Sequence, residues 1–260
     1  MENFNEIKYK LNEFGWVKIE NIYDPDLIKH CNSIIDSLLP KYIDLQKKKK
    51  IYHLSENTLH HICIHYPELV DLIFSDKIYN LLEKLFNGKI ILNCFGASII
   101  SNSSSTYTQK IHRDARDINS SKDMLNLVIL LTKSTRQNGA TYLLENSHKS
   151  PVMTPPSDKE YFDNATQITG NAGDLIIFNP YLWHSSGINH SVKERRVFTP
   201  IVTRPFIKPG LDYVRALGDD FFISCNDKLK QLFGYNSRTP KDLNEFYAVD
   251  EDRFFKRDQK

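Results

Sequence analysis

A series of short, β-rich runs in the second part of the chain limits the fold more than any other feature of the sequence. The runs are KIILNCFGASII (89–100), LNLVILLT (125–132), ATYLL (140–144), DLIIFNP (174–180) and RVFTPIVT (196–203). Turn-like segments separate them, including SNSSS, RQNG, NSHKSP and GNAGD. Many short strands with regular turn signals predict an antiparallel sandwich or barrel.

The first 88 residues have a different, mainly helical pattern. Asp24 and Pro25 are typical of a helix start, and apolar residues then recur at helical spacing up to Leu39. Pro40 predicts the end of that helix. The stretch WVKIE (16–20) alternates like a short strand, and residues 67–87 predict one or two further helices. A helical N-terminal part packed on a β core is the simplest architecture.

Composition and charge exclude several classes of protein. The net charge is only +2, which gives no general reason to expect a nucleic-acid or membrane partner. There is no apolar run of about 18 residues or more, and the N-terminus lacks the apolar segment of a secretory signal. The four cysteines lie far apart and form no CxxC pair. We therefore expect a cytoplasmic protein with reduced cysteines.

The stretch QKIHRD places a histidine and an aspartate two residues apart. If it is extended, His112 and Asp114 point to one face and can bind one ion side by side. His184 follows the strand signal DLIIF after a turn and supplies a third ligand type. Each feature alone has an ordinary explanation as surface or core polarity. Two histidines and one carboxylate together suit non-haem Fe(II) that takes a co-substrate and O2.

Arg195 lies eleven residues after His184 and opens the last β-rich run. An arginine deep in a barrel needs an anionic partner. A dicarboxylate co-substrate that chelates iron at one end would supply that partner at its other end. The guanidinium fork matches a carboxylate in two-point geometry.

Several stretches, in order, resemble the phytanoyl-CoA dioxygenase-like family of Fe(II)/2-oxoglutarate oxygenases. They are FGWVKIENIYDPDLI, QKIHRD, NGATYLLENSHKS, AGDLIIF and WHSSGINHSVKERR, which together span roughly residues 12 to 204. The resemblance implies a double-stranded β-helix (a cupin-like jelly roll) flanked by helices. We expect one oxygenase domain over residues 1–260, with a mainly helical part at 1–88, a jelly-roll core at 89–204 and a C-terminal extension at 205–260.

The resemblance also implies roles for single residues. The family's iron ligands match His112, Asp114 and His184, and its 2-oxoglutarate-binding arginine matches Arg195. Gln109 and Thr141 match residues that contact 2-oxoglutarate in some members, and Ser186, two residues after His184, is a further candidate near the co-substrate. Strict strand alternation would turn Gln109 away from His112, so its predicted role requires a bulge or twist.

The function implied is oxidation of an unactivated C–H bond in a small metabolite, most simply hydroxylation, with release of succinate and CO2. The same Fe(II), 2-oxoglutarate and O2 could instead serve desaturation, epimerisation or ring formation. A third hypothesis is a non-catalytic jelly-roll binding or sensor protein. Arg116 and Asn126 are candidate substrate contacts, and Arg116 is as easily explained by a salt bridge. We expect a monomer or homodimer.

Other polar residues favour structural explanations. His61 and His65 have the i, i+4 spacing of a helical zinc pair, but no third ligand accompanies them at motif spacing, so packing is the preferred interpretation. The run Lys47–Lys50 is typical of a solvated surface. In the extension, Tyr213, Arg215, Tyr235 and Arg238 could form a lid or an oligomer contact.

Overall fold

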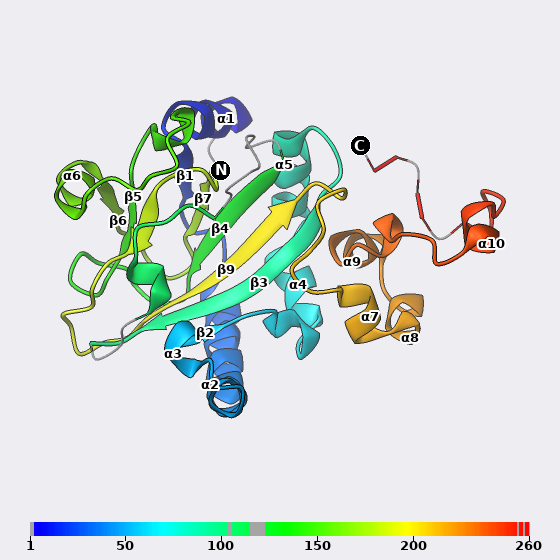
Figure 1. Cartoon of the computed structure of the whole chain (residues 1–260), viewed down its shortest axis with the longest axis horizontal. Coiled ribbons are helices and arrows are strands. Elements are labelled where there is room, and N and C mark those ends of the chain that lie inside the picture. Colours follow the sequence, from blue (N-terminus) through cyan, green and yellow to red (C-terminus); the bar gives the residue numbers. More distant parts are fainter. Residues whose placement is uncertain (1–2, 103–105, 115–122, 254, 257, 260) are drawn as a thin grey trace.

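The structure is a computed structural model that describes residues 3–102, 106–114, 123–253, 255–256 and 258–259. Within these residues the strands form two antiparallel sheets (Figure 1). The larger has the order β1-β7-β4-β9-β3-β2 and the smaller the order β6-β5-β8. Their bounds are β1 Trp16–Ile19, β2 Thr58–Leu59, β3 Ile91–Ile100, β4 Met124–Leu130, β5 Thr141–Leu143, β6 Thr166–Ile168, β7 Leu175–Phe178, β8 His184–Ser186 and β9 Arg195–Thr203. The expected mainly β fold with flanking helices is confirmed.

Helices cover the large sheet and extend the chain beyond it (Figure 1). The α-helices are α1 Phe4–Glu13, α2 Pro25–Lys48, α3 Tyr52–Ser55, α4 Glu68–Ile73, α5 Asp76–Phe86, α6 Asp158–Asn164, α7 Tyr213–Leu217, α8 Asp219–Ile223, α9 Asp227–Leu232 and α10 Leu243–Phe246. Short 3-10 turns are η1 Ile62–Ile64, η2 Tyr107–Gln109, η3 Ser147–Lys149 and η4 Tyr235–Ser237.

The large sheet is buried on both faces, and strand alternation assigns its residues to one face or the other. In β4, Leu125, Leu127 and Ile129 join the core formed with the helices. Val128 and Leu130 point to the opposite face of the strand, where they pack with residues of the small sheet. All seven residues of β4 are therefore buried, and its sequence is a continuous apolar run except for one asparagine. The face toward the small sheet is the one that carries the polar site.

The N-terminal part contributes strands as well as helices. β1 pairs with β7 and β2 pairs with β3, so the large sheet reaches beyond residues 89–204. The prediction that Pro40 ends its helix is wrong, because α2 continues to Lys48. Pro40 lies on the exposed side of α2. Water can therefore satisfy the carbonyl four residues earlier, which lowers the cost of the missing N–H.

The C-terminal extension packs into the main core over much of its length. Tyr213, Phe222, Leu232 and Phe233 are buried in the same apolar cluster as α2, α4 and α5. Tyr213 is only 1% exposed. Its predicted role in a lid or oligomer contact is therefore wrong, since a core side chain serves neither purpose.

The structure also shows whether a helix could span a membrane and in what state the four cysteines are. Among the described residues, the helices are too short or too polar to cross a bilayer. Cys31 and Cys63 are buried, Cys94 and Cys225 are partly buried, and all four carry free thiols.

Candidate iron and 2-oxoglutarate site

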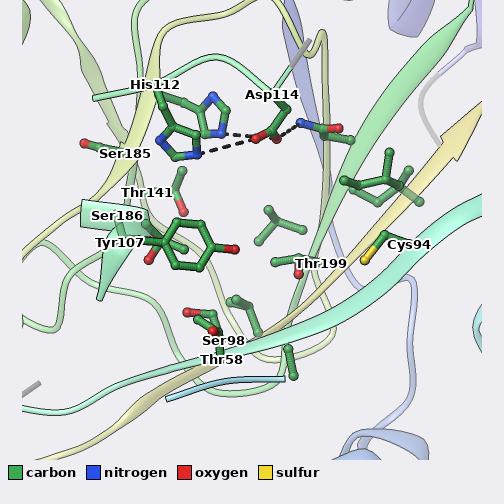
Figure 2. Close-up of a pocket in the computed structure, with 18 of the residues that line it drawn as sticks. Thr58, Cys94, Ser98, Tyr107, His112, Asp114, Thr141, Ser185, Ser186 and Thr199 are labelled. Carbon is green, nitrogen blue, oxygen red and sulfur yellow. Dashed lines mark hydrogen bonds and ion pairs between the residues drawn. The ribbon is translucent and has the colours of Figure 1, made fainter. Parts of the chain in front are cut away.

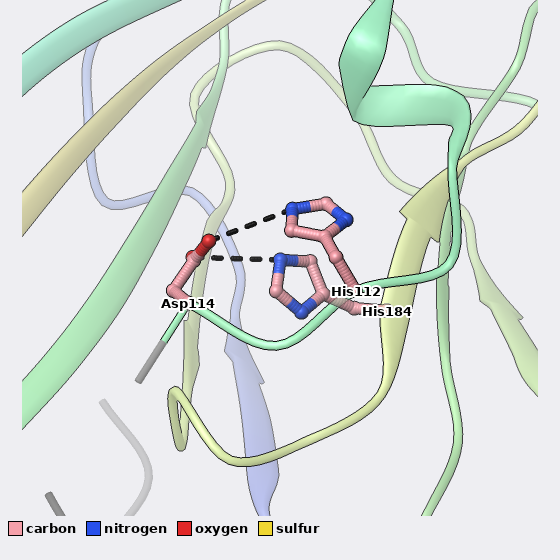
Figure 3. Close-up of side chains that lie close together, drawn as sticks. All are labelled: His112, Asp114 and His184. Atoms are coloured by element: carbon pink, nitrogen blue, oxygen red, sulfur yellow. Dashed lines mark ion pairs between the residues drawn. The ribbon is translucent and has the colours of Figure 1, made fainter. Parts of the chain in front are cut away.

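The structure brings His112, Asp114 and His184 together, and we call them the His–Asp–His cluster (Figure 3). His112 and His184 form an isolated antiparallel bridge in which each backbone N–H donates to the other's carbonyl at 3.0 Å. Their Nε2 atoms each lie 3.5 Å from an oxygen of Asp114. One ligand atom from each residue fits within 4.8 Å of the others. The stretch before His112 is a 3-10 turn rather than the expected strand, yet His112 and Asp114 still share a face.

Backbone carbonyls fix both imidazole rings. His112 Nδ1 lies 2.7 Å from the Lys110 carbonyl, and His184 Nδ1 lies 2.9 Å from the Leu182 carbonyl. A carbonyl can only accept, so each Nδ1 carries the proton. Each Nε2 is then left as a lone-pair donor facing Asp114, which is the usual arrangement of metal-binding histidines.

Charge in the cluster favours a bound cation. Burial alone would raise the pKa of Asp114, but the nearby His184, His112 and Asn126 outweigh it and lower the pKa to about 2. Burial lowers the pKa of His184, and the Asp114 carboxylate more than reverses this, so the net shift is upward. The carboxylate therefore stabilises positive charge at the imidazoles, and a metal ion can replace the proton there. Two imidazole nitrogens and one carboxylate fit the donor set of non-haem Fe(II).

Asn126, predicted as a substrate contact, lies on β4 and lines the cavity. Its Nδ2 donates to Asp114 Oδ2 at 2.5 Å. The amide therefore orients the carboxylate rather than being free for a substrate. This is the kind of outer partner that tunes a metal ligand.

We expect Asn126→Leu to weaken metal binding by about 10- to 100-fold, because Asp114 loses its orienting donor. Leucine matches asparagine in size, so the fold should persist. Anaerobic equilibrium dialysis with Fe(II) would measure the change. An unchanged Fe(II) affinity would show that the Asn126–Asp114 hydrogen bond does not influence metal binding by Asp114.

Arg195 begins β9 and is 1% exposed. Its Nη2 donates to Thr141 Oγ1 at 2.6 Å. Nε and Nη1 are buried and have no hydrogen-bond partner among the described residues. Burial lowers its pKa to about 10, which still leaves it charged at neutral pH. A buried cation with two unused donors fits one end of a dicarboxylate such as 2-oxoglutarate.

The remaining predicted residues have different placements. Ser186 lines the cavity and faces Thr141 across the β5–β8 pair. Gln109 is absent from the described lining, because its Oε1 accepts from the Thr106 N–H at 3.1 Å in the capping box of η2. The prediction that it contacts the co-substrate is not supported by this placement. Arg116 lies outside the described residues.

The cavity has a volume of about 130 Å³ and runs between the two sheets. In Figure 2, His112 and Asp114 lie at one end, Thr58 and Ser98 lie at the other, and Tyr107 lies between them. Tyr107, His60 and Thr199 were missed from the sequence. β9 could have revealed Thr199, since alternation from Arg195 places it on the cavity face. Tyr107 lies in a 3-10 turn and His60 follows the short strand β2, so the alternation of a long strand could not predict their positions.

Arg113 was also missed, and it anchors the loop of the cluster. It is 4% exposed. Nη1 donates to Val152 O at 2.9 Å, and Nη2 donates to Ser147 O at 2.5 Å. The guanidinium also lies 4.5 Å from the Trp183 ring centre. Arg113 lies between His112 and Asp114. Its contacts attach this loop to the segment 147–152 after β5 and to Trp183, the residue before His184.

We expect Arg113→Met to lower the free energy of unfolding by about 2 to 3 kcal/mol, because the charged hydrogen bonds of a buried guanidinium to backbone carbonyls are lost. Metal affinity should fall with it, as the loop loses its anchor. Lys110→Met, an exposed cation on the same loop, is the matched control and should change neither quantity. Denaturant unfolding of the apo-protein would measure the difference, and equal stability of the two variants would contradict the role of Arg113.

The fold and the cluster define the chain as a 2-oxoglutarate-dependent non-haem iron dioxygenase, with Fe(II), 2-oxoglutarate and O2 as its cofactor and co-substrates. The sequence profile of phytanoyl-CoA dioxygenase (PhyH) matches residues 11–197, which is more than half of the chain. The chain therefore belongs to the phytanoyl-CoA dioxygenase family.

The chain is also similar to curated relatives and to solved structures. The uncharacterized protein Rv1501 of Mycobacterium tuberculosis is 23% identical over 99% of this chain and 96% of its own length. Dioxygenase olcK of Penicillium canescens is 29% identical over 77% of this chain and 70% of its own. The non-haem α-ketoglutarate-dependent epimerase SnoN from nogalamycin biosynthesis has the same fold, with a TM-score of 0.65 and 16% identity over 84% of this chain and 91% of its own.

Proposed function

We propose that the protein oxidises an unactivated C–H bond of a small molecule, with hydroxylation as the primary outcome. The observation that carries the proposal is the pairing of the His–Asp–His cluster with a buried arginine that has two unused donors in the same cavity. Bound Fe(II), 2-oxoglutarate and O2 supply the oxidising power: the co-substrate becomes succinate and CO2, and one oxygen atom enters the product.

The chain's own residues hold and orient the reactants. His112, Asp114 and His184 would hold the metal through two imidazole nitrogens and one carboxylate. Arg195, which donates to Thr141, would hold the far carboxylate of the co-substrate and so fix its direction in the cavity. Apolar walls from β4, β7 and β9, which include Val128, Phe178, Val197 and Ile201, keep water away from the reacting carbon. No protein general base is required.

A second outcome, epimerisation or ring closure, has support from the neighbours in fold. SnoN is described as an epimerase and SnoK as a carbocyclase, both from nogalamycin biosynthesis. Both outcomes use the same site and differ only in the fate of the oxidised carbon. A non-catalytic binding protein is less favoured, because every residue needed for metal and co-substrate is in place.

We propose further that residues 1–260 act as one oxygenase domain, as a monomer or homodimer in the cytoplasm. Support for a single unit comes from the core, in which Ile7 of α1 and Phe233 after α9 belong to one apolar cluster.

Anaerobic addition of Fe(II) and 2-oxoglutarate to the apo-protein tests the site. We expect a weak visible metal-to-co-substrate charge-transfer band that requires both additions. Admission of O2 should then release succinate, and product analysis would separate hydroxylation from the other outcomes. A folded, iron-loaded protein that shows no band with 2-oxoglutarate would overturn the proposal.

A further inference from the structure

A second pair of polar side chains faces the cavity away from the cluster. His60 Nε2 lies 3.2 Å from Tyr107 Oη, and the two rings are nearly parallel, with 19° between their planes and 6.3 Å between their centres. Both residues line the cavity. The Tyr107 side chain as a whole is 41% exposed. Figure 2 shows its ring between the cluster end and the Thr58 and Ser98 end.

The backbone of His60 is fixed from two sides. Tyr42 of α2 donates its hydroxyl to the His60 carbonyl at 2.8 Å. The next residue, His61, has φ of 54° in the left-handed region, and its Nδ1 lies 2.8 Å from the hydroxyl of the buried Tyr213. An unusual backbone geometry of this kind persists only when its surroundings hold it. The C-terminal extension thus helps to position His60.

Tyr107 is fixed by the capping box of η2. The Thr106 N–H donates to Gln109 Oε1 at 3.1 Å, which closes the turn on which Tyr107 lies. Gln109 therefore has a clear role in the structure: it shapes the turn that presents Tyr107. Both members of the pair are placed before any ligand arrives, which reduces the entropy lost on binding.

The pair is neutral at neutral pH and lies among mostly apolar walls. Burial lowers the pKa of His60. Burial, followed by the charge of Asp114, raises the pKa of Tyr107 to about 12. Among the described lining residues, Asp114 and Arg195 are the charged side chains, and both are already assigned to metal and co-substrate. The lining of the same cavity also includes apolar residues, among them Leu59, Ala97, Val128 and Val197.

We infer that Tyr107, oriented by His60, is the specificity contact for a neutral, mainly apolar substrate that carries a hydroxyl or carbonyl oxygen. The phenol can donate to that oxygen or accept from it, while His60 takes the complementary role. The contact anchors one end of the substrate and aims a C–H bond toward the cluster. This inference rests on the proposed function and names the substrate class of the same site.

Proton relaxation with Mn(II) in place of iron tests both ideas at once. The full chain is loaded with Mn(II) and 2-oxoglutarate, and cyclohexanol is added as a neutral probe. Enhanced relaxation of the 2-oxoglutarate protons reports the proposed site. Enhanced relaxation of the cyclohexanol protons reports a probe bound near the metal. Cyclohexylammonium and cyclohexanecarboxylate are the charged counterparts.

We expect Tyr107→Phe to weaken cyclohexanol binding by about five- to tenfold, the effect of one lost hydrogen bond. 2-Oxoglutarate binding should not change. His60→Phe should weaken probe binding by about threefold, since the phenol loses its orienting partner, and His60→Gln should restore most of it. Tyr247→Phe removes a hydroxyl from a 75% exposed side chain outside the described cavity lining and is the matched control.

The outcomes separate the two ideas. Absence of 2-oxoglutarate enhancement in the wild type would overturn the proposed function, and the inference with it. Normal 2-oxoglutarate enhancement would leave the proposed function in place while the probe decides the inference. The inference is wrong if cyclohexanol shows no enhancement up to its solubility limit. It is also wrong if Tyr107→Phe binds the probe as the wild type does, or if a charged counterpart binds more tightly.

Discussion

The Asp114→Asn variant is expected to lose iron binding by on the order of a thousandfold, and succinate release with it. Asp114 is the anionic member of the cluster, and its low pKa keeps it charged at neutral pH. Loss of an outer partner of a metal ligand already costs about 10- to 100-fold, and loss of the charged ligand itself should cost more. Anaerobic equilibrium dialysis and a succinate assay would measure the two losses.

The asparagine variant should still fold. Asparagine has the shape of aspartate. The buried Asn126 Oδ1 has no hydrogen-bond partner among the residues that the structure describes, and a flip of the Asn126 side chain would let it accept from the new amide. Asp163→Asn is the control, because Asp163 is an exposed carboxylate on α6 that pairs with Lys159. Iron affinity within threefold of the wild type in Asp114→Asn would remove this residue from the ligand set.

Arg195→Met should raise the 2-oxoglutarate concentration needed for the charge-transfer band by about 30-fold or more. Truncating one partner of a buried, hydrogen-bonded charge pair costs about 2–5 kcal/mol, and each 1.4 kcal/mol is a factor of ten. The same change should stabilise the apo-protein, since it removes a buried charge with two unused donors. A variant that melts at a higher temperature and binds its co-substrate poorly is therefore the expected result.

Arg196→Met is the matched control for this experiment. Arg196 is the next residue of β9, but its side chain pairs with Asp36 and Glu194 at the surface. Its loss should leave 2-oxoglutarate affinity unchanged and should not raise the melting temperature. If Arg195→Met bound 2-oxoglutarate as tightly as Arg196→Met, the assignment of the co-substrate's far carboxylate to Arg195 would be wrong.

The strands and the main site residues could be predicted because they follow simple periodicities. β4 and β7 are mainly apolar runs, and strand alternation along β9 places Arg195 on a definite face. His112 and Asp114 could be recognised as metal-ligating types two residues apart, although they follow a 3-10 turn, and His184 as a metal-ligating type shortly after β7. Their convergence follows from antiparallel pairing, since the His112–His184 bridge joins two segments that are distant in sequence.

What could not be predicted depends on single hydrogen bonds and on packing. The spacing of Thr106 and Gln109 is that of a capping box, which is a local signal in the sequence. The family resemblance instead assigned Gln109 to the co-substrate. Asn126 was rightly placed at the cavity, yet only the structure shows its amide held by Asp114. Arg113 points away from the cluster, and its partners are backbone carbonyls that no side-chain pattern encodes.

The family match ends at residue 197, only three residues into β9. β9 lies between β3 and β4 and pairs with both of them. An expression fragment cut at that boundary would leave two long strands with unsatisfied backbone edges, which invite aggregation. It would also lack the buried aromatic residues of the C-terminal extension. The boundary of sequence similarity and the boundary of a soluble, foldable product therefore differ in this protein, and fragments should extend at least through Phe233.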